Sequence, residues 1–287
     1  MEVDTELALL ALRGIGLAAT FMSFDEKDSE GAGGDEEAGV DIVLDGEEDV
    51  LTGDGPDTIS GATGGNVSTT GGDDVISLSI GYNLVDGGDG NDDIYLEDGY
   101  SATVEGGAGD DTISAAGLLR GEIRGGDGED RLVMDDDYTY DEVSRGHGGA
   151  GDDVLEVGVM LTGEAAEYEQ YNAAPWISGD AGADVFEVTL NPVGAGYLDE
   201  PSVSETLVTV GDFNQAEDSL VVDLSDVGTD STFLGAEMVA DDAGAGSILV
   251  LRFDSNEAGD FQVGQIFLPN APGPTMDDVT LILPAAA

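Results

Sequence analysis

The chain of 287 residues contains no cysteine, one histidine and one tryptophan, and its seven Lys and Arg residues face 63 Asp and Glu residues. Without cysteine there can be no disulfide and no thiolate metal site. Zinc prefers His or Cys ligands, so a zinc centre is not expected. The formal net charge of −56 repels phosphate backbones and anionic lipids, so nucleic acid and anionic membrane surfaces are not expected as partners.

The same scarcity argues against an enzyme. His147 lies between Gly146 and Gly148, where we expect a loop residue rather than a catalytic base. The sequence has no G-x-S-x-G, and a single histidine cannot supply an H-E-x-x-H motif. Carboxylates are plentiful enough for glycosidase chemistry, so a carbohydrate-active site on the loops is kept as an alternative.

Glycine and aspartate are abundant instead, with 45 Gly residues, and the two recur together in one phrase between residues 50 and 190. Each copy places glycines before an Asp, and a large apolar residue stands two positions after that Asp. A disordered acidic chain would not repeat this placement. The copies are Gly53–Ile59, Gly71–Ile76, Gly87–Ile94, Gly106–Ile113, Gly125–Leu132, Gly148–Leu155 and the looser Gly179–Phe186.

The key aspartates, defined as the Asp two positions before that apolar residue, are 17, 18, 19, 19, 23 and 31 residues apart. A coil of two short strands and two turns takes about 18 residues, so each copy marks one complete coil. All key aspartates should therefore share one side, the aspartate edge, while the opposite edge carries degraded turns. The long intervals predict insertions on the opposite edge, near 134–145 and 160–176. The key aspartates are Asp57, Asp74, Asp92, Asp111, Asp130, Asp153 and Asp184.

The stretches between the turns are predicted to be minimal strands, each with one side chain pointing inward. Repeated winding of turn and strand gives two parallel sheets around an apolar core, an all-β solenoid. The inward residues predicted after the key aspartates are Ile59, Ile76, Ile94, Ile113, Leu132, Leu155 and Phe186, and those of the facing sheet are Val85, Val104 and Ile123.

The copies match the nonapeptide G-G-x-G-x-D-x-U-x, and on them the chain resembles the RTX family of hemolysin-type calcium-binding proteins. The resemblance covers about half of the chain. It implies a parallel β-roll, secretion by the type I route and an extracellular or cell-surface location. It also implies calcium ions between successive turns of one edge, held by the repeat aspartates and by glycine carbonyls.

The charge pattern independently favours a bound cation. Neighbouring strands lie about 4.8 Å apart, so stacked key aspartates repeat at that distance. Two like charges there repel by roughly 0.9 kcal/mol in water and about 3.5 kcal/mol at an effective dielectric of 20. Calcium accepts many hard oxygen ligands in flexible geometry, whereas Mg²⁺ demands a tight octahedron. Calcium is therefore the expected cofactor.

Seven stacked turns leave six gaps, so about six Ca²⁺ ions are expected. The ligand positions predicted for them come from the glycines and acids of the copies. They are Gly53, Gly55, Asp57, Gly72, Asp74, Gly88, Asp89, Gly90, Asp92, Gly107, Gly109, Asp111, Gly126, Asp127, Gly128, Asp130, Gly149, Gly151, Asp153, Gly182 and Asp184.

Outside the roll, expected over 41–190, the sequence predicts three further parts. Residues 1–24 form a hydrophobic helix around the apolar stretch Leu7–Met22, which covers the open roll or docks on a partner, with a membrane or signal segment as the alternative. Residues 25–40 form an acidic flexible linker. Residues 191–287 form a β-rich cap, with strands predicted at Leu207–Val210, Leu220–Leu224, Ile248–Phe253, Phe261–Leu268 and Val279–Leu283. Its last strand, near Val279–Leu283, resembles a type I secretion signal or is an ordinary closing strand.

The function expected from these parts is that of a secreted calcium-binding β-roll protein without enzymatic activity, serving a structural or adhesive role at a cell surface or in a matrix. It folds when it binds extracellular calcium. Its expected partner is calcium. Further candidate partners are a second copy of the chain and a cell-surface or polysaccharide partner. One alternative is a self-assembling filament or surface-layer subunit that uses the N-terminal apolar segment, and the other is the carbohydrate-active enzyme.

Overall fold

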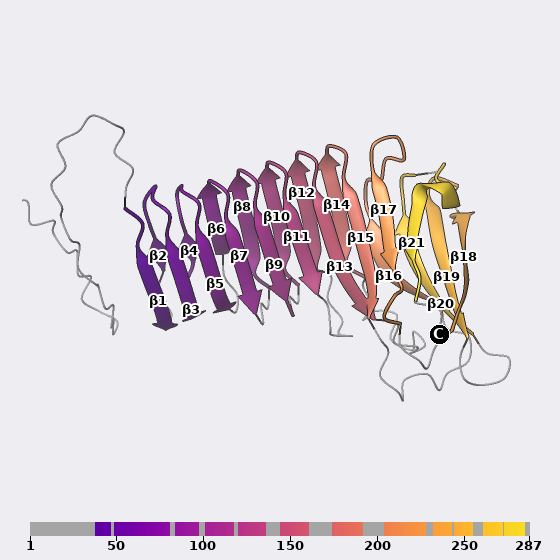
Figure 1. Cartoon of the computed structure of the whole chain (residues 1–287), viewed down its shortest axis with the longest axis horizontal. Coiled ribbons are helices and arrows are strands. Elements are labelled where there is room, and N and C mark those ends of the chain that lie inside the picture. Colours follow the sequence, from indigo (N-terminus) through magenta and orange to yellow (C-terminus); the bar gives the residue numbers. More distant parts are fainter. Residues whose placement is uncertain are drawn as a thin grey trace, which may run out of the picture. The chain divides into compact units, whose positions relative to one another are not determined.

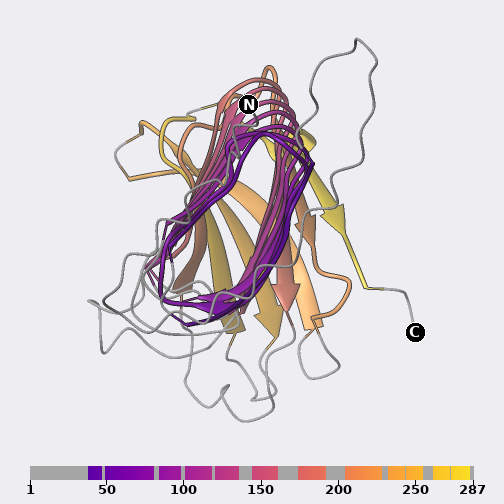
Figure 2. The same ribbon diagram turned by 90° about the vertical axis from the view of Figure 1, so that its left-hand side faces the viewer.

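Two sheets wind around a shared apolar core in a computed structural model of the chain (Figures 1 and 2). The structure describes residues 38–46, 49–80, 84–97, 101–117, 120–135, 144–160, 174–191, 204–227, 232–242, 244–254, 261–271 and 273–284. All of these belong to the compact unit Glu36–Ala287. The helix expected over 1–24 and most of the linker expected over 25–40 lie outside the described residues.

The first sheet has ten strands, and every strand pairs in parallel with its neighbours. In spatial order they are β1 (Asp41–Gly46), β3 (Thr58–Thr63), β5 (Val75–Ile80), β7 (Asp93–Glu97), β9 (Thr112–Ala116), β11 (Arg131–Asp135), β13 (Val154–Met160), β15 (Val185–Asn191), β17 (Ser219–Asp223) and β21 (Val279–Ile282).

The second sheet has eleven strands. Its strands are parallel from β2 to β20, and the last three pair as an antiparallel meander. In spatial order they are β2 (Val50–Leu51), β4 (Val67–Ser68), β6 (Leu84–Asp89), β8 (Thr103–Ala108), β10 (Glu122–Asp127), β12 (Arg145–Ala150), β14 (Trp176–Ala181), β16 (Ser204–Val210), β20 (Phe261–Leu268), β19 (Ser247–Asp254) and β18 (Thr232–Ala240).

The all-β class with parallel sheets predicted from the repeats is thereby confirmed. Viewed along the stack, successive coils superpose as a flattened loop, with one sheet on each side (Figure 2). All ten predicted inward residues are at most 1 % exposed. The strands bury more than was predicted, because β7 places both Ile94 and Leu96 in the core and β15 does the same with Phe186 and Val188.

The aspartate edge is the upper edge in Figure 1, where each second-sheet strand turns into the next first-sheet strand. The strands run further into the glycines than the sequence suggested. For example, β10 continues through Gly125 and Gly126 to Asp127, and only the following residues form the turn. Every key aspartate is the residue immediately before a first-sheet strand. Most of each insertion expected at the opposite edge, residues 136–143 and 161–173, lies outside the described residues.

The C-terminal part extends both sheets rather than forming a separate layer. Strands β16 and β17 continue the parallel winding, and β21 pairs with β17 as the closing strand of the first sheet. Five of these six C-terminal strands were predicted. The sixth, β18, was missed because Gly235, Ala236 and Glu237 interrupt its apolar pattern. No helix in the described residues is long and apolar enough to cross a membrane.

Candidate metal centre

A ladder of buried carboxylates runs along the aspartate edge. The side chains of the seven key aspartates are at most 3 % exposed. In each, Oδ1 accepts a hydrogen bond from a backbone N–H one coil earlier: Oδ1 of Asp111 accepts from Asp92 at 2.8 Å, and Oδ1 of Asp130 accepts from Asp111 at 2.8 Å. The same bond occurs at every coil of the series. It begins with the backbone N–H of Val40, which donates to Asp57, and ends with that of Asp153, which donates to Asp184. One oxygen of every key aspartate is therefore fixed by the backbone.

The ladder has an eighth rung that the sequence analysis missed. Oδ1 of Asp218 accepts from the backbone N–H of Asp184 at 3.1 Å. Its Oδ2 accepts from the backbone N–H of Asn214 at 2.7 Å, within the same turn. The residues before Asp218 lack the glycine spacing of the other copies, so the motif alone could not identify this rung.

The second oxygen of the key aspartates has a different environment. In six of them Oδ2 is buried, and no hydrogen-bond partner for it exists in the described part of the chain. A buried acceptor without a donor costs about 1–3 kcal/mol, and more when it is charged. Six such atoms in equivalent positions indicate a shared missing partner. They belong to Asp57, Asp74, Asp92, Asp111, Asp130 and Asp153.

Backbone carbonyls point into the same spaces. A Cβ added to Gly106 would lie 2.4 Å from Oδ2 of Asp111 and 2.6 Å from the carbonyl oxygen of Gly125, one coil later. The equivalent position at Gly125 would lie 2.3 Å from Oδ2 of Asp130 and 2.6 Å from the carbonyl oxygen of Gly148. Two acceptors thus converge where no side chain fits.

We call this space the cradle of a coil. It is bounded by Oδ2 of the key aspartate, by the leading residue five positions before that aspartate, and by the carbonyl of the next leading residue. From the third coil onward every leading residue is glycine. These leading glycines were not among the predicted ligand positions. They are Gly87, Gly106, Gly125, Gly148 and Gly179.

The electrostatics of the cradles favour a positive partner. Burial is the main cause that raises the pKa of Asp111 to about 7, with neighbouring carboxylates adding to the effect and the backbone hydrogen bond from Asp92 opposing it. Burial likewise raises the pKa of Asp153 to about 7 and those of Asp92 and Asp184 to about 6. A proton or a cation is needed to neutralise these groups.

The donor set suits a hard cation. Each cradle offers carboxylate and carbonyl oxygens, which are the ligands that Ca²⁺ takes in flexible numbers. In the described residues no three His, Cys, Asp or Glu side chains converge on one point, so carboxylates alone would not hold an ion. Backbone carbonyls would have to complete the coordination shell. The residues therefore fit calcium and offer nothing that suits zinc.

The glycines that were predicted as ligands have a conformational role in this structure. Gly107 has a φ of 126°, and its Cβ would lie 1.9 Å from the carbonyl oxygen of Gly88 one coil earlier. Only glycine allows this approach. The same close stacking with positive φ occurs at Gly72, Gly88, Gly90, Gly109, Gly126, Gly128, Gly149, Gly151 and Gly182, whereas Gly53 and Gly55 of the first coil have no positive φ.

Two predicted acidic ligands lie outside the cradles. Asp89 and Asp127 are exposed at the ends of β6 and β10, and their backbone carbonyls accept from Gly72 and Gly109. A second, exposed ladder lies beside the first, in which Oδ1 of Asp110 accepts from the backbone N–H of Glu129 at 2.9 Å. These outer acids support the turns, but their side chains are not buried with the unpaired oxygens.

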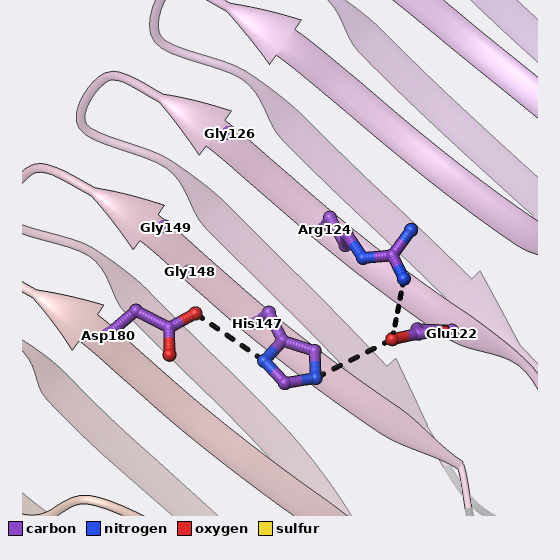
Figure 3. A pocket seen from close by; sticks show the side chains of 7 residues that line it. All are labelled: Glu122, Arg124, Gly126, His147, Gly148, Gly149 and Asp180. Atoms are coloured by element: carbon purple, nitrogen blue, oxygen red, sulfur yellow. Dashed lines mark ion pairs between the residues drawn. The ribbon is translucent and has the colours of Figure 1, made fainter.

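The outer face of the second sheet carries a cavity of about 340 Å³ around His147 (Figure 3). His147 was predicted in a loop, but it lies within β12, because the strand continues through the glycines that flank it. Its Nδ1 is 3.4 Å from Oδ2 of Asp180, and its Nε2 is 3.6 Å from Oε1 of Glu122. Since the two carboxylates face opposite sides of the ring, they do not converge on one ion.

Two arginines of the roll pair with acids. Arg124 contacts Glu105 at 2.7 Å and Glu122 at 2.8 Å, and Arg131 contacts Glu156 at 2.5 Å on the other sheet. Exposed pairs of this kind contribute little to stability. The charged groups around the cavity already have partners, so the cradles remain the stronger candidate site.

No protein-family model matches this chain, and a search of curated proteins gives no match. The chemistry of the site is therefore inferred from its own residues.

Proposed function

We propose that this protein is a secreted RTX-type β-roll that binds about six calcium ions in the cradles of the aspartate edge. The observation that carries the proposal is the set of six buried Oδ2 atoms without a hydrogen-bond donor. A bound cation would neutralise these oxygens and the carbonyls beside them. The proposal includes a non-enzymatic structural or adhesive role at a cell surface or in an extracellular matrix.

Calcium binding and folding would be coupled. Each cradle combines atoms from two successive coils, so it does not exist in the unfolded chain. An ion that binds only the folded state stabilises it by mass action. Extracellular calcium modules typically bind at about 10⁻⁴–10⁻³ M, which would keep the chain unfolded where calcium is scarce. In this proposal the segment around β21 also serves type I export, because it resembles such secretion signals.

Circular dichroism of the full chain during a calcium titration tests the proposal. We expect a cooperative gain of β-structure that chelator reverses and that magnesium at equal concentration does not reproduce. Bound ions counted by native mass spectrometry should approach six. A chain that is fully folded in excess chelator and binds no calcium would disprove the proposal.

A second candidate, self-assembly, is favoured by the first coil. Val43 of β1 is 80 % exposed and Leu51 of β2 is 75 % exposed, and both strands are the terminal strands of their sheets. Exposed strand edges can pair with another chain. Light scattering should show larger particles for the full chain than for a chain that begins at Val40 if the N-terminal apolar segment drives assembly. Equal particle sizes would exclude assembly through the N-terminal apolar segment.

A further inference from the structure

The cradles are not chemically equal, because the first two coils carry threonine as the leading residue. Thr52 stands five positions before Asp57, and Thr69 stands five positions before Asp74. The sheet register confirms the equivalence: Val67 and Ser68 pair with Val85 and Asp86, which aligns Thr69 with Gly87. The second copy is therefore complete, with Thr69 and Thr70 in place of two glycines, although the sequence pattern identified only Gly71–Ile76.

The side chain of Thr69 fills its cradle. Thr69 is 2 % exposed, and its Oγ1 donates a short hydrogen bond to the carbonyl oxygen of Gly87. This carbonyl is the atom that bounds the second cradle, just as the Gly125 carbonyl bounds the cradle of Asp111. The hydroxyl also lies beside the carboxyl group of Asp74. It has a single hydrogen, which the Gly87 carbonyl takes, and Oδ2 of Asp74 is left without a donor.

We propose that Thr69 closes the second cradle to calcium, with its methyl and hydroxyl groups occupying the space that an ion fills in the glycine-led coils. This inference rests on the proposed function. The closure removes one of the six expected ions, so the second coil is held by a hydrogen bond that needs no metal, and Oδ2 of Asp74 is left to a proton. Thr52 differs, because its Oγ1 is buried without a hydrogen-bond partner in the described residues and therefore does not donate to the next carbonyl as Thr69 does.

Ion counting in conservative variants tests the inference without altering the backbone. In the full chain at saturating calcium, Asp74→Asn should leave the number of bound ions unchanged, because no ion uses that carboxylate. The matched change Asp111→Asn in a glycine-led coil should lower the number by one. In both variants Asn Oδ1 can still accept the backbone hydrogen bond from the preceding coil, donated by Asp57 and by Asp92 respectively. Loss of one ion in Asp74→Asn would overturn the inference.

Opening the cradle gives the reverse experiment. Thr69→Gly recreates the glycine lead of the third coil and should raise the number of bound ions by one, while Thr69→Ser keeps the hydroxyl and should bind as many ions as the natural chain. A Thr69→Gly protein that folds in calcium with an unchanged ion count would overturn the closure. A natural chain that binds no calcium at all would instead refute the proposed function, so the two failures are distinguishable.

Discussion

At the residue scale, the behaviour of the site depends on one atom per coil, the Oδ2 oxygen of the key aspartate. Its partner oxygen is already fixed by a backbone N–H, for example from Asp111 to Asp130. The carboxylate therefore cannot rotate away to find a donor without breaking the ladder. The buried Oδ2 is left to a proton or to a cation, and these two should compete.

Replacing one key aspartate should remove one ion. Asp130→Asn keeps an oxygen for the Asp111 N–H but replaces Oδ2 with an amide nitrogen that cannot bind calcium. We expect one fewer bound ion and a loss of roughly 1–3 kcal/mol in unfolding free energy at calcium concentrations of 10 to 100 times Kd, measured by urea denaturation. The exposed neighbour Glu129 supplies the control, because Glu129→Gln should change neither quantity.

Acid should replace calcium. The folded-state pKa values of Asp111 and Asp153, about 7, lie above the ordinary value of 3.8, so the folded chain holds more protons than the unfolded chain between these pH values. Their contribution favours folding below pH 4 and is lost as the pH rises through 6 to 7. In chelator, circular dichroism should show more β-structure at pH 4 than at pH 8. The opposite trend would contradict the burial of these carboxylates.

At the element scale, the repeat determined most of what could be predicted. Regular spacing of Ile94, Ile113 and Leu132 after glycine turns was sufficient for parallel strands in register, because a strand buries alternate side chains. The secondary structure of the glycines was not predicted correctly. Sequence rules assign them to turns, but here they lie in strands such as β12 because neighbouring backbones stack too closely for a Cβ. That crowding comes from the adjacent coil and cannot be read from a local pattern.

The candidate site, like the fold, could be predicted only in part. The key aspartates follow from the motif, but their Oδ1 and Oδ2 atoms have separate roles that only the stacking of coils reveals. The leading glycines, the closed cradle at Thr69 and the terminal rung at Asp218 depend on contacts between coils. Sequence separations of 17 to 34 residues hide those contacts from pattern reading.

A single methyl group in the stacked glycines should disrupt the coil. Gly107→Ala would place a Cβ 1.9 Å from the Gly88 carbonyl at a φ of 126°, so both a clash and backbone strain oppose it. We expect a loss of roughly 3 kcal/mol or more in unfolding free energy in calcium. Gly273→Ala is the matched control, because its Cβ would meet the side chain of Gln215 at 3.0 Å and nothing rigid. Equal effects would argue against close stacking.

At the scale of the whole molecule, two electrostatic problems must be separated. The net charge of −56 repels across the exposed surface, and salt screens such repulsion over about 10 Å at 0.1 M. The unpaired Oδ2 atoms are buried, where mobile salt ions do not reach them. Screening therefore addresses the first problem and leaves the second.

High salt should not replace calcium. In chelator at pH 8, 1 M NaCl shortens the screening length to about 3 Å but supplies no ligand for the cradles. We expect circular dichroism to show little gain of β-structure in NaCl and a full gain on addition of millimolar calcium. Complete folding in NaCl alone would show that surface repulsion, rather than the buried oxygens, keeps the chain unfolded.

The terminal rung gives the ladder a direction. Each key carboxylate reaches back to the coil before it, and Asp218 is held by Asn214, only four residues away in its own turn. That last turn can form before any ion arrives. Folding can then begin at this turn, because Oδ1 of Asp218 is already placed to accept from the backbone N–H of Asp184. The coil of Asp184 would then offer the same acceptor to the coil before it. Growth of the roll would thus proceed vectorially, from the C-terminal end toward the N-terminus.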